Sequence, residues 1–155
     1  MPISSGITAP EFELLDDTNT PRKLSDFRGR KVVLYFYPND DTPGCIKEAC
    51  SFRDNYSAYE KADIVLLGVS ANDIKSHVKF KKKYDLPFPL LVDEGHRVCD
   101  KYGVWGPKKL MGKSYEGILR TTFVIDENGI IVKVFENVRP SEHSVEVLSA
   151  LGVSE

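Results

Sequence analysis

The feature that most constrains the fold is an uninterrupted apolar segment at residues 31–37, with the sequence KVVLYFY. It is rich in β-branched and aromatic side chains, and it ends at Pro38. Residues 63–70 form a second segment of the same kind. Short apolar runs without alternation are typical of strands that are covered on both faces. We therefore expect a sheet whose inner strands are buried on both sides.

Segments with helical or strand character alternate along the rest of the chain. Helices are predicted over residues 42–61, 72–84, 94–102 and 141–150, and strands over 90–92, 119–126 and 130–136. The last two strands are joined through DENG, which is typical of a hairpin. This order predicts an α/β (α+β) fold, with a mixed central sheet flanked by helices. Functional residues are expected beyond the carboxyl end of a strand, first of all after Tyr37.

Length, charge and cysteine content exclude several classes of protein. The 155 residues predict a single domain over 1–155. With 21 basic and 23 acidic residues, binding of nucleic acid or an anionic membrane through bulk charge is disfavoured. No apolar run approaches the roughly 20 residues of a membrane span. No export signal is visible, so we expect a cytoplasmic location. Three cysteines then favour a catalytic, redox or metal role over structural disulfides.

Cys45 lies where the predicted helix 42–61 begins. Thr42 is a favourable N-cap residue, and Pro43 suits the first helical position. Cys45 is then in the first turn, where free amides and the helix dipole favour a thiolate. From position alone, a reactive nucleophile and a small buried core residue are equally good interpretations.

Cys50 follows five positions later. On an ideal helix this spacing separates the two Cα atoms by roughly 8–9 Å, whereas a disulfide needs about 7 Å or less. The two cysteines are therefore unrelated, or the helix unwinds locally to join them. The spacing is not C-x-x-C, which disfavours a thioredoxin-type dithiol.

The run YPNDDTPGC, the second cysteine five residues on and the distal segment GKSYEGILRTTFVID resemble the peroxiredoxins. They are most similar to the bacterioferritin-comigratory-protein/peroxiredoxin Q group, and the resemblance covers nearly the whole chain. It implies a thioredoxin-like fold with an N-terminal extension. It also implies a thiol-dependent peroxidase that reduces hydrogen peroxide and alkyl hydroperoxides without metal or cofactor. Thioredoxin or a glutaredoxin would be the reductant, and the protein would be a monomer, with a dimer possible.

The same resemblance implies roles for five residues. Cys45 corresponds to the peroxidatic cysteine and Cys50 to the resolving cysteine. Thr42 corresponds to the hydroxyl that binds thiolate and peroxide, Pro38 to the residue that shields the pocket, and Arg120 to the distal arginine. Without the resemblance, Thr42 would be read as a helix cap and Arg120 as a surface ion pair. Two alternative functions use the same fold: a disulfide-exchange protein, and a redox sensor that signals through oxidation of Cys45 and Cys50.

Several other polar residues are predicted to be structural. Cys99 is expected to be a semi-buried structural thiol, with a secondary resolving or glutathionylated thiol as the alternative. His77 is expected to be a packed or half-exposed histidine and not a ligand. His143 is expected on the surface near a helix start. A zinc site that uses His96 and Cys99 is disfavoured, because the spacing matches no structural zinc pattern. The lysines of helix 72–84 are expected to form its solvated outer face; they are Lys75, Lys79, Lys82 and Lys83.

Overall fold

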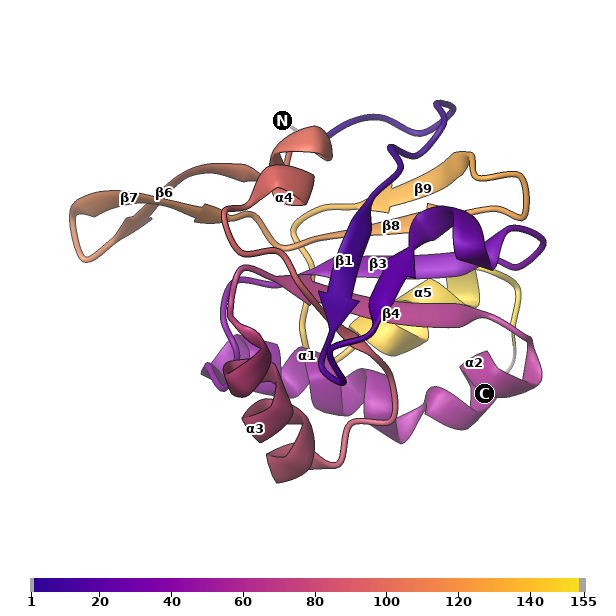
Figure 1. Cartoon of the computed structure of the whole chain (residues 1–155), viewed down its shortest axis with the longest axis horizontal. Helices are drawn as coiled ribbons and strands as arrows, with labels where there is room; N and C mark the ends of the chain where they lie inside the picture. The colour runs from indigo at the N-terminus through magenta and orange to yellow at the C-terminus, as the bar shows by residue number, and fades with distance from the viewer. Residues whose placement is uncertain (1, 154–155) are drawn as a thin grey trace.

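A seven-stranded mixed sheet forms the centre of the protein (Figure 1). The computed structural model describes residues 2–153. The strand order is β2-β1-β5-β4-β3-β8-β9; β3, β4 and β5 are parallel, and the other pairings are antiparallel. The strands of this sheet are β1 (Glu13–Asp16), β2 (Pro21–Lys23), β3 (Val32–Phe36), β4 (Val65–Ser70), β5 (Leu90–Val92), β8 (Thr121–Ile125) and β9 (Ile131–Phe135). The mixed sheet that the sequence predicts is confirmed.

Helices cover both faces of this sheet. The described helical elements are η1 (Leu24–Phe27), α1 (Pro43–Asp54), α2 (Tyr56–Lys61), α3 (Ile74–Tyr84), α4 (Arg97–Lys101) and α5 (His143–Ala150). In the described part of the chain, no helix has the length and apolar character that crossing a bilayer requires.

Strand β3 contributes to two separate hydrophobic cores. Val32, Leu34 and Phe36 belong to the core beneath the N-terminal segment and α4. The alternate residues Val33 and Tyr35 belong to the core beneath α1, α2, α3 and α5. Successive side chains of a strand point to opposite faces, so a strand buried on both sides must be apolar throughout. The prediction for the segment 31–37 is confirmed on this point.

The single helix predicted over residues 42–61 is wrong, because the structure breaks it at Asn55. The Asn55 side-chain amide donates to the Ser51 carbonyl at 3.0 Å and to Ser144 Oγ at 2.8 Å. An asparagine side chain that bonds to a nearby carbonyl competes with the helical backbone pattern. The hydrogen bond from Asn55 to Ser144 also links the end of α1 to α5.

A second hairpin, β6 (Trp105–Leu110) and β7 (Lys113–Ile118), extends from the body of the protein as an arm (Figure 1). The sequence analysis does not predict these two strands. Most described side chains of β7 are exposed, so the hairpin lacks the apolar alternation of a half-buried strand. The turn of the hairpin is formed by Met111 and Gly112, which both have positive φ, of 52° and 79°; only Gly112 is a residue type that favours such a turn.

The surface prediction for His143 is wrong, because its side chain is fully buried. The ring packs 5.6 Å from that of Phe52 and 5.4 Å from that of Phe135, and Nε2 lies 2.7 Å from Thr122 Oγ1. Burial lowers the pKa of this imidazole. The first turn of α5 packs against α1, and a residue near a helix start is therefore part of the core.

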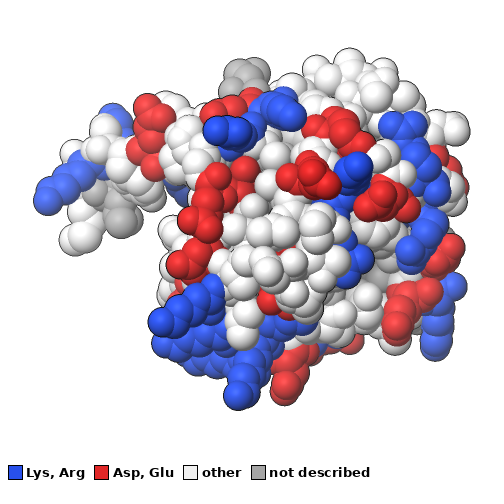
Figure 2. Space-filling view, viewed as in Figure 1, with Lys and Arg blue, Asp and Glu red and all other residues white. Residues whose placement is uncertain are grey.

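The lysines of α3 form an exposed basic surface, as predicted. Figure 2 shows blue side chains gathered at the lower left, over the position of α3 in Figure 1. Lys75, Lys79, Lys82 and Lys83 are exposed. His77 lies on the opposite, buried side of the same helix, which confirms that it is a packed histidine.

Gly68 provides a test of how tightly the sheet is packed. A Cβ atom at this position would lie 3.0 Å from the Tyr35 ring and 3.1 Å from Leu90 Cδ2, and both side chains are buried with no room to move away. We expect Gly68→Ala to lower the free energy of unfolding by roughly 1–3 kcal/mol, as overpacked cores do. Urea denaturation measures this change.

The matched control is Gly106→Ala in β6, where the added Cβ would meet only Leu119 Cδ1 at 3.6 Å. This variant should retain the stability of the wild type to within about 0.5 kcal/mol. Equal stability of the two variants would contradict the packing argument.

Candidate active site

The loop that follows β3 leads directly into α1. Thr42 occupies the N-cap position with extended backbone angles, and Pro43 is the first helical residue, as predicted. The Thr42 hydroxyl does not cap the helix; it donates to the Asn39 carbonyl at 3.0 Å. The cap interpretation of Thr42 is therefore right for the backbone and wrong for the side chain. The hydroxyl stabilises the loop by this bond, and the first-turn amides of α1 receive no hydrogen bond from it.

Cys45 and Arg120 are brought together at this helix start. The Cys45 side chain is buried, and Arg120 Nη2 donates to its Sγ at 3.5 Å. Arg120 directly precedes β8, whose Thr121 is paired with Phe36 at the end of β3. The antiparallel register of β8 on β3 thus places an arginine from late in the chain beside the cysteine. The alternative of a surface ion pair for Arg120 is wrong, because only 19% of its side chain is exposed.

Gly44 is what permits the close approach of Arg120. A Cβ atom at residue 44 would lie 2.9 Å from Arg120 Nη2. That distance is too short for a real side chain, so any larger residue would displace the guanidinium. The glycine that precedes Cys45 therefore has a steric role in the site.

Glu48 is a member of the site that the sequence analysis missed. It is fully buried one turn after Cys45, and its Oε1 accepts from Arg120 Nη1 at 2.6 Å. Burial raises the pKa of this carboxyl to about 7, although Arg120 acts in the opposite direction. Its second oxygen, Oε2, has no hydrogen-bond partner among the described residues. The available signal is an acidic residue three positions after the cysteine, on the buried face of the same helix.

Arg120 stays positively charged in this environment. Burial of the guanidinium lowers its pKa, but the contacts with Glu48 and Cys45 outweigh burial, and the net direction is upward. A fixed positive charge therefore faces the sulfur from one side and the carboxyl from the other.

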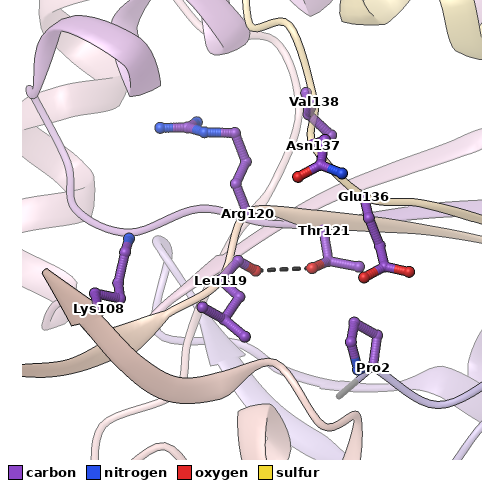
Figure 3. A pocket seen from close by; sticks show the side chains of 8 residues that line it. All are labelled: Pro2, Lys108, Leu119, Arg120, Thr121, Glu136, Asn137 and Val138. Atoms are coloured by element: carbon purple, nitrogen blue, oxygen red, sulfur yellow. Dashed lines mark hydrogen bonds between the residues drawn. The ribbon is translucent and has the colours of Figure 1, made fainter.

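Two cavities flank this site. One has a volume of about 370 Å³ and is lined in part by Arg120, Thr121, Glu136 and Asn137 (Figure 3). In Figure 3 the guanidinium of Arg120 points away from Glu136. The other cavity, of about 170 Å³, lies between Pro38 and the β6–β7 hairpin.

Lys108 lines both cavities, and the sequence analysis missed it as well. Its Nζ donates to the Ile118 carbonyl at 2.8 Å across the base of the hairpin. Burial, with Arg120 as a further cause, lowers the pKa of the Lys108 amine. Pro38 is half-buried at the same cavity, and the hairpin side chains Trp105, Tyr115 and Ile118 complete this wall.

Cys50 lies in α1 with Cys45, and both thiols are free. Cys50 is half-buried, and burial raises the pKa of its thiol, with Arg53 acting in the opposite direction. Since α1 is continuous from Pro43 to Asp54, the Cα separation of roughly 8–9 Å expected for an intact helix applies. The structure therefore represents the reduced, helical form of the site.

Cys99 is remote from this site, on the opposite face of the sheet. It is fully buried, and burial, together with Asp93, raises the pKa of its thiol. Within residues 2–153, no three His, Cys, Asp or Glu side chains are grouped so as to hold a metal ion. The burial of Cys99 fits its structural interpretation, and its place on the other face of the sheet separates it from Cys45.

Comparison of sequences places the chain among known peroxiredoxins. A profile of the AhpC/TSA family matches residues 6–134. The chain is 50% identical to "Putative peroxiredoxin bcp" of Coxiella burnetii, over 97% of this chain and 100% of that protein. It is 46% identical to "Peroxiredoxin Bcp" of Bacillus subtilis, over 97% of this chain and 96% of that protein.

Comparison of structures agrees. The protein is similar to a bacterioferritin comigratory protein of Xanthomonas campestris, with a TM-score of 0.89, 32% identity, and coverage of 96% of this chain and 98% of that chain. For a cysteine-to-serine mutant of Xylella fastidiosa PrxQ, the TM-score is 0.91, with 32% identity and coverage of 97% and 96%. The thioredoxin-like fold that the sequence predicts is confirmed. The chain therefore belongs to the AhpC/TSA family, as a peroxiredoxin of the bacterioferritin-comigratory-protein/peroxiredoxin Q group.

Proposed function

We propose that Cys45 is the peroxidatic nucleophile of this thiol-dependent peroxidase, and that Arg120 supports its reaction. The observation that carries the proposal is the contact of 3.5 Å between Arg120 Nη2 and Cys45 Sγ. A guanidinium beside a sulfur at the start of a helix favours the thiolate, which is the reactive form.

The peroxide step follows from this geometry. The Cys45 thiolate attacks one peroxide oxygen, the O–O bond breaks, and a sulfenic acid forms. The leaving oxygen departs as hydroxide or alkoxide and takes up a proton to give water or an alcohol. Negative charge moves from sulfur to the leaving oxygen, so preorganised donors must face both atoms. Arg120 and the open amides of the first turn of α1 supply these donors, and neither metal nor cofactor is required.

Thr42 and Pro38 complete the proposed site. The Thr42 hydroxyl donates its hydrogen bond to the Asn39 carbonyl. The lone pairs of its oxygen can therefore accept a hydrogen bond from the peroxide. Pro38 has no backbone N–H and forms one wall of the smaller cavity, which limits competition from water.

Resolution requires Cys50. The Cys45 sulfenic acid condenses with the Cys50 thiol to form a disulfide with loss of water, after the start of α1 unwinds. A dithiol reductant then restores both thiols and is itself oxidised to a disulfide. We propose thioredoxin or a glutaredoxin as this reductant.

Further features of the proposal concern the substrate and the state of the protein. The Xanthomonas structure concerns alkyl peroxide reduction. In this chain, the cavity of about 370 Å³ beside Arg120 offers room for the organic group of an alkyl hydroperoxide. A monomeric, cytoplasmic protein with one domain over residues 1–155 remains our prediction.

Substitution of the nucleophile tests the function directly. Cys45→Ser should reduce peroxide consumption to the uncatalysed rate, because a serine hydroxyl is not ionised at neutral pH. A coupled assay with thioredoxin, its reductase and NADPH measures turnover. Cys99→Ser, on the other face of the sheet, is the control and should consume peroxide like the wild type. Substantial activity in Cys45→Ser would refute the assignment, and oxidation of the wild type without turnover would favour the redox sensor.

Substitution of the proposed resolving cysteine separates the two chemical steps. Cys50→Ser should complete one turnover and then stop, because the remaining thiol, Cys99, is buried on the opposite face of the sheet from the sulfenic acid. Dimedone should trap Cys45 as a sulfenic acid in this variant, and mass spectrometry measures the adduct. If Cys50→Ser cycles normally with thioredoxin, Cys50 is not the obligatory resolving residue.

The buried carboxyl predicts a dependence of stability on pH. The pKa of Glu48 is about 7 in the folded protein, against 4.5 as its ordinary value. Between these values the folded state holds a proton that the unfolded state has lost, so this group's contribution to stability falls as pH rises. The amide introduced by Glu48→Gln does not titrate. The variant therefore does not show this group's loss of stability as pH rises. We expect its free energy of unfolding, relative to the wild type, to increase by roughly 1–3 kcal/mol from about pH 5 to about pH 8.

Urea denaturation at both pH values measures the effect. The same substitution at an exposed position of α2, Glu60→Gln, is the control and should keep a constant difference from the wild type. A constant difference for Glu48→Gln as well would show that Glu48 ionises normally in the folded protein.

A further inference from the structure

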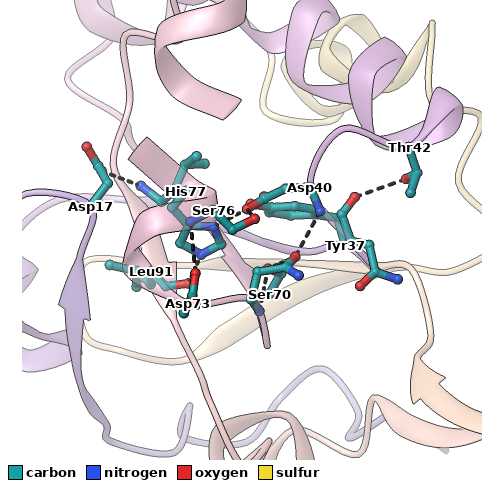
Figure 4. Close-up of polar contacts among 12 residues, drawn as sticks. Asp17, Tyr37, Asp40, Thr42, Ser70, Asp73, Ser76, His77 and Leu91 are labelled. Atoms are coloured by element: carbon teal, nitrogen blue, oxygen red, sulfur yellow. Dashed lines mark hydrogen bonds and ion pairs between the residues drawn. The ribbon is translucent and has the colours of Figure 1, made fainter. Parts of the chain in front are cut away.

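The loop between β3 and Cys45 is held by a buried ion pair for which the reaction scheme has no role (Figure 4). Asp40 Oδ2 lies 2.6 Å from Nδ1 of His77 in α3. The His77 side chain is fully buried, and only 3% of the Asp40 side chain is exposed. Because both side chains are buried away from water, the contact between them offsets the cost of burying each one. Loss of one partner would leave the other as a buried polar group without this hydrogen bond.

The hydrogen bonds around this Asp40–His77 pair are complete. His77 Nε2 lies 2.8 Å from the Leu91 carbonyl, which can only accept, so Nε2 carries a proton. Asp40 also accepts from the Tyr37 hydroxyl at 2.6 Å and from Ser76 Oγ at 2.7 Å. The pair thus connects the active-site loop to α3 and, through the histidine, to β5. Figure 4 shows these side chains converging on the Asp40 carboxylate.

The backbone of the loop depends on the same attachment. The Asp40 amide donates to Asn72 Oδ1 at 2.8 Å, which adds a second link toward α3. The next residue, Asp41, has φ of 59°, in the left-handed region that costs energy for a residue other than glycine. Asp41 pairs with Lys83 at 2.9 Å, but this pair is exposed and contributes little. Asp40 is therefore a buried attachment of the loop itself, two residues before the N-cap of α1.

We propose that the Asp40–His77 pair positions Cys45 for attack on peroxide and limits how readily the start of α1 unwinds to form the disulfide. The inference rests on the proposed function, in which Cys45 and Cys50 can bond only after unwinding. With the pair intact, the N-terminal end of the segment that rearranges is held on α3. When the pair is weakened, the loop that leads to Thr42 and Cys45 is no longer held against α3. His77 is a positioning residue, because it acts through Asp40 and the loop.

The pair then influences whether the oxidised Cys45 forms a disulfide or is oxidised further to sulfinic acid. In the unwound form, the Cys45 sulfenic acid condenses with the Cys50 thiol and loses water. In the helical form, it remains in the peroxide site, where a second peroxide oxidises it to sulfinic acid and is itself reduced to water or an alcohol. A contact that favours the helical form shifts this partition toward sulfinic acid, since it changes the populations of the two forms.

The test compares the same substitution at two buried carboxylates. Asp40→Asn keeps the shape of the side chain and removes the charge of the pair. The control is Asp93→Asn, because Asp93 also has a buried carboxylate, which accepts from the amides of Val98 and Cys99 at the start of α4, on the other face of the sheet. Stopped-flow kinetics gives the rate constants for Cys45 oxidation and for disulfide formation, and mass spectrometry gives the sulfinic fraction.

For Asp40→Asn we expect Cys45 oxidation to slow about tenfold, because the nucleophile is less well positioned. Disulfide formation should accelerate about threefold or more, and the sulfinic fraction at a given peroxide concentration should fall, because the unwound form is more populated. Asp93→Asn should keep both rate constants within about twofold of the wild type. Amide exchange over residues 43–50 should accelerate in Asp40→Asn and remain unchanged in the control.

A milder variant keeps the test decisive if Asp40→Asn does not fold. Ser76→Ala removes one hydrogen bond to Asp40 and leaves the ion pair in place, so its changes should have the same direction and a smaller size. The inference is overturned if the folded variants are less stable but keep the wild-type rate constants and sulfinic fraction. It is also overturned if Asp93→Asn shifts the partition equally. Absence of Cys45 oxidation in the wild type would instead overturn the proposed function.

Discussion

The site depends on one buried guanidinium that is shared between a sulfur and a carboxyl. Arg120 contacts Cys45 through Nη2 at 3.5 Å and Glu48 through Nη1 at 2.6 Å. An ionised Glu48 neutralises the guanidinium, whereas a protonated Glu48 leaves the positive charge facing the Cys45 sulfur. Because burial raises the pKa of Glu48 to about 7, both forms exist near neutral pH. The electrostatic support of the sulfur is therefore coupled to the protonation of a carboxyl one helical turn away.

The rest of the fold holds this arrangement while the chemistry requires part of it to move. The pairing of β8 with β3 places Arg120, and Gly44 gives it space. In the proposed reaction, a disulfide between Cys45 and Cys50 forms only when the start of α1 unwinds. The break at Asn55 separates α1 from α2, so the buried residues Ala58 and Tyr59 belong to a helix separate from the one that carries Cys45. In the proposed mechanism, the buried attachment of the preceding loop through Asp40 opposes unwinding of α1. This attachment therefore favours attack of Cys45 on peroxide and slows formation of the disulfide.

Where sequence-based prediction failed, a tertiary contact had overridden a local pattern. Residues 42–61 have continuous helical periodicity, but the Asn55 side chain finds a partner in α5 and ends α1. His143 has the character of a surface residue, but the packing of α5 against α1 buries it between two phenylalanine rings. The β6–β7 hairpin is stabilised by its own pairing and exposes most of its described side chains, so it carries no alternating pattern.

Local features could be predicted from the sequence alone: a strand apolar on both faces, a helix that begins at Thr42 and Pro43, and a cysteine in its first turn. These follow from steric and hydrogen-bonding preferences within a few residues. The resemblance to peroxiredoxins added Arg120 as a partner, although no local pattern indicated it. Three contacts became apparent only in the folded protein: Glu48 shares the guanidinium, Lys108 lines both cavities, and His77 contacts Asp40. Such contacts depend on strand register and helix packing between distant segments, which short-range periodicity does not specify.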